Sequence, residues 1–260
     1  IVCGASNFSV GEHVVVAEPG VTLPGDFTIT SRETYGHVSD GMICSERELG
    51  LGPDHAGIMV LSGVEPGQNA NELLGIGDQV LDIAITPDRG YALSVRGIAR
   101  EVATAFGVDL RDPASHFVPE LGAPAAGMTP RDCVIDDFSA CELLTLRTVN
   151  GFNPDSSTPH YMVARLQASG IRSISLAVDV TNYVMLELGQ PTHAFDLDKL
   201  QGPVRVRRAE SGEKLETLDH VERILSPLDT VIADSSGPIG LAGTMGGFTS
   251  EIDENTTNIA

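Results

Sequence analysis

The sequence predicts a multidomain protein of the α+β class. Short β-rich runs separated by Gly and Pro turns fill residues 1–62, an amphipathic helical pattern follows in residues 94–107, and short alternating runs recur after residue 200. Strands and helices thus occur in separate blocks, which favours an α+β arrangement. The 260 residues suffice for one to three domains. The chain starts at Ile1 without Met, which predicts a piece of a longer polypeptide.

Residues 1–62 are predicted to form a small barrel or sandwich, because closely spaced strands with Gly/Pro turns are typical of such domains. Three runs are rich in β-forming residues: "HVVVAE" (13–18), "FTIT" (27–30) and "GIMVL" (57–61). Residues 63–76 resemble a connector. The run "QVLDIAIT" (79–86) alternates and predicts a further strand.

A helix is predicted from Ser94 to Gly107. Its apolar residues follow the i, i+3, i+4, i+7 spacing of a buried helical face, with Ser94 as the cap and Gly107 as the end. Residues 108–130 are rich in Pro, Gly and Ala and predict a linker. A second helix is bracketed by Thr158 as N-cap, Pro159 at the first helical position and Gly170 at the end.

The last third is predicted to contain a strand, a short helix and then a series of strands. The run "ISLAVDV" (174–180) alternates and predicts a strand, and a short helix should follow from about Asn182 to Leu188, stopped by Gly189. Further strands are expected at about 203–208, 214–218, 222–225, 230–233 and 239–242, the last leading into "GTMGG" (243–247).

The composition restricts the partners that the chain can bind. A net charge of −20 argues against a nucleic-acid binder unless basic residues gather locally. Arg205 and Arg207 in "VRVRRA" would share one strand face and are one such candidate, although a solvated strand face is the simpler explanation. No apolar run is long enough for a membrane span. Four scattered cysteines without a CxxC pair argue against zinc and fit reduced thiols in the cytoplasm.

Two stretches could carry chemistry, although the sequence has no P-loop, HExxH, hydrolase elbow or dinucleotide fingerprint. The paired glycines of "GTMGG" let a backbone approach a ligand closely, but a plain tight turn is the alternative. In "DVTNYVMLELGQPTHAFD" (179–196), Thr181 and Asn182 follow a predicted strand end and His193 follows a short helix, so the three could meet in one pocket. Alternatively, Asn182 caps the helix and His193 satisfies a buried carbonyl. The nearby carboxylates are spaced as solvated faces, and no metal is expected.

The stretch "DVTNYVMLELGQPTHAFDLDKLQGPVRVRRAESGEKLETLDH", followed by "VIADSSGPIGLAGTMGG", resembles the editing domain of the bacterial phenylalanyl-tRNA synthetase β subunit. "SDGMICSERELGLGPDHAGI" looks like the end of that family's tRNA-binding OB module, and "LDIAITPDRGYALSVRGIAREVATAFG" resembles the segment after it. The resemblance covers nearly the whole chain, with residues 111–157 the most diffuse. The family usually has an Arg and an aromatic where this chain has Leu143 and Leu144, and Asp-Gly where it has Asp219 and His220.

This resemblance implies a partial OB-type β-barrel, a small α+β segment and a mixed α/β editing domain. The expected segments are an OB-fold tRNA-binding module in 1–62, a small α+β segment in 63–110, a linker in 111–130 and a truncated editing domain in 131–260. The family's reader of the tyrosine hydroxyl is an acidic residue that would fall about two positions after Ala260.

The resemblance also implies hydrolysis of tyrosine mis-attached to tRNA(Phe), within a class II phenylalanine–tRNA ligase. Thr181, Asn182 and His193 would lie at the ester, His193 positioning the substrate or acting as a base. Gly246, with Pro191, Gly243 and Met245, would line the substrate pocket, and Arg205 and Arg207 would contact tRNA. The alternative function is a non-catalytic tRNA-binding and structural region.

No cofactor is expected in this piece, since ATP and magnesium would serve only the complete cytoplasmic enzyme. The implied partners are tRNA(Phe) and the α subunit, in an α2β2 heterotetramer.

Overall fold

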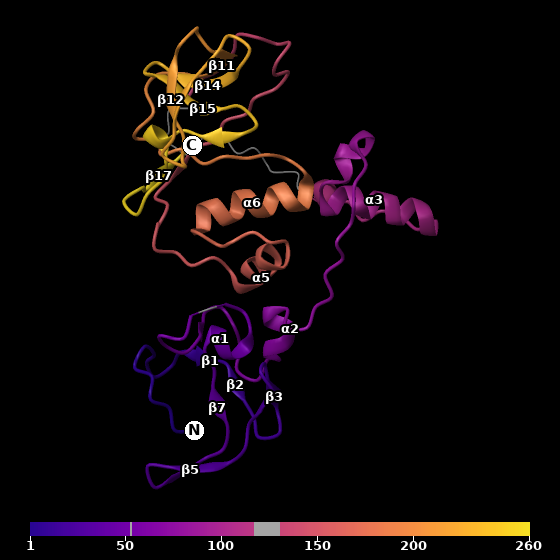
Figure 1. Ribbon diagram of the computed structural model, residues 1–260, viewed down its shortest axis with the longest axis vertical. Helices are drawn as coiled ribbons and strands as arrows, with labels where there is room; N and C mark the ends of the chain where they lie inside the picture. Colours follow the sequence, from indigo (N-terminus) through magenta and orange to yellow (C-terminus); the bar gives the residue numbers. More distant parts are fainter. Residues whose placement is uncertain (53, 117–130) are drawn as a thin grey trace. The chain divides into compact units, whose positions relative to one another are not determined.

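The computed structural model describes residues 1–52, 54–116 and 131–260 (Figure 1). The chain divides into two compact units. Ile1–Asp82 and Pro159–Gly170 form the first, and Ile83–Thr158 and Ile171–Ala260 form the second. These units cut the chain differently from the predicted segments, because residues 63–110 are shared between them. Most of the predicted linker, residues 117–130, lies outside the described residues.

The first unit consists of short antiparallel strand pairs and short helices. Its strands are β1 (His13–Val14), β2 (Val16–Ala17), β3 (Thr22–Leu23), β4 (Phe27–Thr28), β5 (Arg32–Thr34), β6 (His37–Ser39), β7 (Met42–Ile43) and β8 (Val60–Leu61). They pair as β1–β8, β2–β7, β3–β4 and β5–β6. The three predicted runs all contain strands, whereas β3, β5, β6 and β7 were not predicted. The OB-type barrel stays a prediction, since the described pairings are two-stranded.

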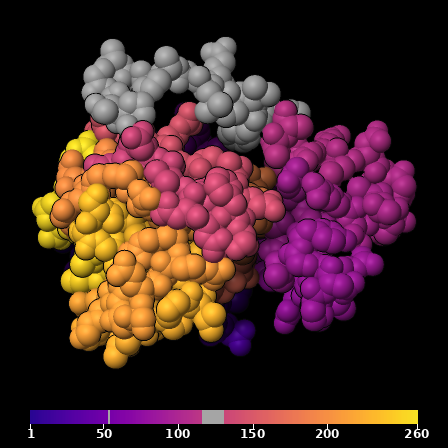
Figure 2. Space-filling model, turned by 90° about the horizontal axis from the view of Figure 1, so that it is seen from above, coloured from indigo at the N-terminus to yellow at the C-terminus, as the bar shows by residue number. Residues whose placement is uncertain are grey.

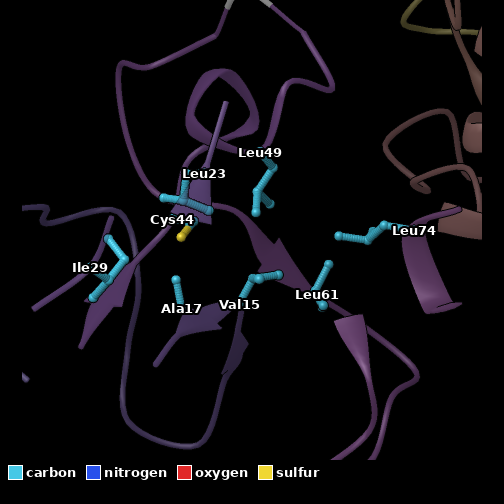
Figure 3. Close-up of a cluster of buried hydrophobic side chains, with 8 residues drawn as sticks. All are labelled: Val15, Ala17, Leu23, Ile29, Cys44, Leu49, Leu61 and Leu74. Carbon is cyan, nitrogen blue, oxygen red and sulfur yellow. The ribbon is translucent and has the colours of Figure 1, made fainter. Parts of the chain in front are cut away.

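Aliphatic side chains form the core of this unit (Figure 3). Helices α1 (Glu46–Leu49) and α2 (Ala70–Leu74), the strands and the residues directly beside the strands contribute its eight buried residues: Val15, Ala17, Leu23, Ile29, Cys44, Leu49, Leu61 and Leu74. Burying aliphatic side chains removes apolar surface from water and stabilises the unit. Helix α2 lies within the stretch predicted as a connector, and Asn69 caps it by accepting from Asn71 N–H.

Helix α5 (His160–Ala168) confirms the predicted second helix and buries Met162 and Leu166. Its start differs by one residue, because Pro159 occupies the N-cap position. The hydroxyl of Thr158 donates instead to the carboxylate of Asp179, at 2.5 Å. The helix thus begins without a side-chain cap.

The second unit begins with an extended segment and two helical elements. The strand predicted for 79–86 is wrong: these residues have no strand partner in the described part of the chain, and Leu81 is 78% exposed. Alternation alone cannot make a strand where no neighbouring strand supplies hydrogen bonds. The 3-10 helix η1 (Pro87–Ala92) and α3 (Val95–Phe106) follow, the latter with the predicted Ser94 and Gly107 caps. A short helix, α4, spans Pro113–His116.

Helix α6 (Leu176–Leu188) replaces the predicted strand and short helix. The expectation for 174–180 was therefore wrong. Apolar residues occur all round this helix, so their alternation matched a strand by coincidence. The end was predicted correctly, because Gly189 adopts the left-handed conformation (φ 77°) and its N–H bonds to the carbonyl of Met185.

A five-stranded mixed sheet organises the rest of the second unit, in the order β16-β15-β14-β11-β9. Its strands are β9 (Cys133–Ile135), β11 (Val204–Arg208), β14 (Thr230–Asp234), β15 (Gly237–Leu241) and β16 (Met245–Gly246). Only the β9–β11 pair is parallel. In Figure 2 the pink atoms that follow residue 131 lie against orange and yellow atoms, as this pairing requires.

Two further strand pairs complete the unit. The hairpin of β12 (Lys214–Glu216) and β13 (Glu222–Ile224) turns at Asp219 and His220. Strand β10 (Val149–Asn150) pairs with β17 (Asn258–Ile259), and the 3-10 helix η2 (Phe248–Ser250) follows β16. The strands predicted between residues 203 and 242 are thus all confirmed, with small shifts of their ends.

Candidate functional site

The structure brings His193 directly against Gly246. A Cβ atom built on Gly246 would lie 2.4 Å from Cε1 and 2.5 Å from Nε2 of His193. Real Cβ atoms do not approach other heavy atoms so closely, so the imidazole occupies the space that any larger residue at position 246 would need. The loop after α6 and strand β16 therefore meet at one point of the second unit.

The stretch "GTMGG" (243–247) contains the turn that joins β15 to β16 and both residues of β16. Leu241 pairs with Met245 and Gly240 with Gly246, while Gly243 sits in the left-handed region at φ 67°. The turn interpretation is therefore correct, and the close approach at Gly246 exists as well. Gly243 is exposed and has no neighbouring atoms within 4 Å of a built Cβ.

The second glycine of the pair, Gly247, has a different environment. A Cβ at this position would lie 2.7 Å from the carbonyl oxygen of Ile239 and 2.9 Å from Cδ1 of Leu215. Its own N–H donates to that carbonyl at 2.8 Å. Backbone atoms crowd Gly247, whereas a side chain crowds Gly246.

Helix α6 carries Thr181 and Asn182, so neither follows a strand end as predicted. Asn182 lies well inside the helix, which also rules out the capping role; Ser175 is the N-cap. The Thr181 hydroxyl donates to the carbonyl of Val178 at 2.7 Å. The Thr192 hydroxyl donates to the carbonyl of Thr181 at 3.3 Å. This bond joins the residue directly before His193 to helix α6.

The structure connects some of these predicted residues by direct contacts or hydrogen bonds, but not all of them. Thr181 is tied through Thr192 to the loop that presents His193, and Pro191 is exposed in that loop. Asn182 is half-buried, and no hydrogen bond among the described residues links it to His193 or Gly246. The predicted cluster is thus tightest between His193 and Gly246.

The imidazole of His193 packs edge-on against Phe195, with ring centroids 4.6 Å apart. Although the residue keeps an exposed edge, protein atoms remove much of the ring from water, and this burial lowers the pKa of His193 below its ordinary value. The ring is therefore neutral at pH 7 and offers one N–H donor and one nitrogen acceptor.

Leu218 at this site was not predicted, and Asp179 in α6 has a different environment from the one predicted. A Cβ on Gly246 would lie 3.3 Å from Cδ1 of Leu218, so this apolar side chain lies beside the His193 contact. Asp179 is fully buried in the first turns of α6 and accepts from Ser173 Oγ at 2.5 Å and Ile174 N at 2.9 Å, besides Thr158. The expectation that Asp179 lies on a solvated face, with the other nearby carboxylates, is therefore wrong for this residue.

The arginines of β11 are engaged by carboxylates of the same unit. Arg205 forms a bidentate pair with Asp136, at 3.0 and 2.7 Å, and Arg207 one with Glu213, at 2.9 and 2.6 Å. Both alternate with buried valines and share a face, as predicted. Their predicted contact with tRNA would have to compete with these pairs.

No group of three or more His, Cys, Asp or Glu side chains suited to a metal ion occurs within the described residues. None of the helices described here is long and apolar enough to cross a membrane. All four cysteines are free.

Comparisons with known proteins find close relatives for the whole chain. Residues 140–260 match the family model described as the B3/4 domain. The chain is 57% identical over its full length to the phenylalanine–tRNA ligase beta subunit of Thermobifida fusca (strain YX), of which it spans 31%. It is 55% identical, again over its full length, to the same subunit of Nocardia farcinica (strain IFM 10152). The chain thus spans about a third of the length of these relatives.

A solved structure is also similar in part. It is a crystal structure of an N-terminal fragment of the phenylalanyl-tRNA synthetase β subunit from Pyrococcus horikoshii, 16% identical, covering 73% of this chain and 60% of its own, with a TM-score of 0.37.

Proposed function

We propose that the chain is a portion of a phenylalanine–tRNA ligase β subunit whose second unit hydrolyses tyrosine mis-attached to tRNA(Phe). The identity of 57% over the whole chain supports the first part. The contact between the His193 ring and Gly246, within the residues that match the B3/4 domain, supports the second.

The chemistry of tyrosine and phenylalanine creates the need for such a site. Tyrosine is phenylalanine with one added hydroxyl, and an apolar pocket rejects an added hydroxyl only weakly, by about a hundredfold in comparable cases. A second site that hydrolyses the wrong product can correct the remaining errors. Such a site needs an apolar wall for the aromatic ring and a few polar groups that orient an ester and a water.

The described residues can supply these groups. Leu218 offers an apolar wall beside the His193 ring, which packs on the buried backbone of Gly246. The neutral His193 can accept a hydrogen bond from water or donate one to the ester, which suits a positioning role. A water held at the ester then attacks the carbonyl carbon, and the ribose oxygen leaves with the proton that the water loses.

Charge favours the second unit over the first as the place of tRNA contact. The first unit, residues 1–82 and 159–170, contains twelve Asp and Glu residues against only Arg32, Arg47 and Arg165, so a polyanion is repelled there unless its contact is local. The remaining expectations extend this proposal: an α subunit as partner in a cytoplasmic α2β2 enzyme, with ATP and magnesium serving that complete enzyme.

The test is deacylation by the full chain of Tyr-tRNA(Phe) and Phe-tRNA(Phe), measured side by side. Release of tyrosine is expected, with only a weak preference over phenylalanine, because the acidic residue expected to read the tyrosine hydroxyl lies outside these residues. Gly246→Ala should reduce this release strongly, because its Cβ displaces the His193 ring. Gly212→Asn is the matched control, since Gly212 lies in an open turn at φ 79° that Asn tolerates. It should leave the rate unchanged.

The alternative is a tRNA-binding and structural region without chemistry of its own. Absence of deacylation by a folded wild-type chain that still binds tRNA(Phe) would favour that alternative. Equal deacylation rates for Gly246→Ala and wild type would show that the His193–Gly246 contact has no part in hydrolysis.

A further inference from the structure

The turn of the β12–β13 hairpin is attached to residues 243–247, named the glycine loop from here on. Leu218 N–H donates to the carbonyl of Gly246 at 3.2 Å, and Thr217 forms a β-bridge with Gly247. The residues that follow Leu218 in the turn are therefore held beside the loop that contacts His193.

Two aromatic rings lie together where these segments meet. The rings of His220, in the turn, and Phe248, directly after the glycine pair, have centroids 4.8 Å apart and an interplanar angle of 61°. Both are accessible: Phe248 is 40% exposed, and the His220 side chain is 67% exposed. Part of the surface of each side chain is therefore open to solvent next to the candidate site.

The chain holds the His220 ring in place at a conformational cost. His220 has φ 58°, a left-handed conformation in which most non-glycine residues are uncommon. The Thr217 hydroxyl donates to Asp219 Oδ1 at 2.5 Å, and Arg223 donates to Asp219 Oδ2 at 2.9 Å. These bonds lower the pKa of Asp219 to about 2, and the bond from Thr217 has the largest effect. The carboxylate is therefore charged, and its bonds to Thr217 and Arg223 hold the turn.

The charges around the pair are nearly balanced, unlike those of the chain as a whole. Lys214 pairs with Glu222 at 2.7 Å and Arg223 pairs with Asp219. Glu216 is the remaining carboxylate of this hairpin, and it lies 3.4 Å from the His220 ring. The hairpin therefore repels a polyanion less than most of this acidic protein does.

Building on the proposed function, we propose that the His220–Phe248 pair stacks an unpaired base of the tRNA 3′ end while the aminoacyl group enters beside His193 and Gly246. Unpaired bases bind proteins largely by stacking on Phe, Tyr, Trp or His rings, and this contact needs no phosphate neutralisation. A stacked base next to the glycine loop would hold the ester within reach of the site.

The test measures deacylation of Tyr-tRNA(Phe) by the full chain and by Phe248→Ala and His220→Gly. Loss of a stacked base should raise KM by about 5- to 150-fold and change kcat little. His220→Gly removes the ring and also relieves the left-handed backbone, so this variant should fold at least as well as wild type. Hydrolysis of tyrosine methyl ester, which has no base, should be equal in all three proteins.

Phe138→Ala is the matched control. Phe138 is 68% exposed and follows β9, at the opposite edge of the sheet from β16. It should leave KM unchanged. A second readout is the fluorescence of 2-aminopurine at the 3′-terminal position of tRNA(Phe), which stacking quenches. The quenching should weaken in both ring variants.

The outcomes separate this inference from the proposed function. Unchanged KM and unchanged quenching in Phe248→Ala and His220→Gly overturn the stacking contact, even where deacylation continues, and leave the rings as a packing contact. Phe248-dependent quenching without any deacylation by wild type supports the stacking contact and overturns the proposed hydrolysis.

Discussion

The glycine loop and helix α6 both bring residues to the candidate site, but different contacts hold them. Backbone atoms fix the glycine loop: Gly247 N–H bonds to Ile239 O, and Leu218 N–H bonds to Gly246 O. Hydrogen bonds of side chains hold the helix. At its start, the buried carboxylate of Asp179 accepts from Ser173 and Ile174. In the loop after its end, the Thr192 hydroxyl donates to the carbonyl of Thr181.

This difference determines which substitutions each region tolerates. A backbone contact leaves no room for added atoms but does not depend on the identity of a polar side chain. A side-chain hydrogen bond is lost with its donor or acceptor, and a buried partner left behind then lacks the water that it would have in the unfolded chain. The glycine loop should therefore be sensitive to added volume, and α6 to the loss of polar groups.

The largest effect is expected from Asp179→Ala in α6. Asp179 is fully buried and accepts hydrogen bonds from Thr158, Ser173 and Ile174. Removing the carboxylate leaves these donors without their acceptor and should lower the free energy of unfolding by about 3–5 kcal/mol. Urea titration measures this change. Asp179→Asn keeps one acceptor oxygen and should lose less; a loss below about 1 kcal/mol in the alanine variant would contradict the assigned role.

The next largest effect is expected from Gly247→Ala in the glycine loop. Its Cβ would meet the Ile239 carbonyl at 2.7 Å, and backbone cannot move aside cheaply. Overpacking of this kind costs about 1–3 kcal/mol of unfolding free energy. Gly246→Ala is the matched control, because the atoms that it meets belong to the His193 ring, which can rotate into solvent. If both variants lose the same free energy of unfolding, the backbone contact at Gly247 is no more restrictive than the side-chain contact at Gly246.

The same contrast explains what the sequence could predict. The strands between 203 and 242 were found because their alternation matches a sheet with one buried face, as Val204 and Val206 in β11 illustrate. Helix α6 was missed because apolar residues surround it, so that a period of two and a period of 3.6 fit equally well. The hydrogen bonds of Asp179 stabilise the start of this helix. They could not be predicted, because some of their donors approach Asp179 only in the folded chain.

The candidate site was predictable to a similar extent. The proximity of His193 and Gly246 was expected from the spacing of the motifs together with the family resemblance, and the structure places these residues in contact. The position of Leu218 and the separate role of Gly247 depend on how β12 and β15 meet, which no local pattern encodes. The bidentate carboxylate partners of Arg205 and Arg207 likewise come from residues distant in sequence or across a turn.

A smaller effect is expected in the titration of His193, where the two regions touch. Burial lowers the pKa of His193 in the folded protein, so its contribution to stability is complete above the ordinary value of about 6.5 and is lost as the pH falls through the folded pKa. Gly246→Ala should push the ring into water and raise this pKa towards the ordinary value. An NMR titration of the His193 Cε1 proton measures both proteins. Identical pKa values would mean that the glycine does not keep the ring buried.

The smallest effect is expected from Thr192→Val, at the point where the loop after α6 returns to the helix. The Thr192 hydroxyl donates to Thr181 O at 3.3 Å, but Thr192 is exposed, so water can replace the bond. Its loss should therefore lower the free energy of unfolding by only about 0.5 kcal/mol. Because His193 follows directly, even a small loosening of the loop should lower kcat/KM for Tyr-tRNA(Phe) by about two- to threefold, since well-placed groups lose rate when they are displaced. Thr192→Ser keeps the hydroxyl and should behave as wild type in both measurements. If Val and Ser variants deacylate at the same rate, the helix does not position His193 through this bond, and the glycine loop alone fixes the ring.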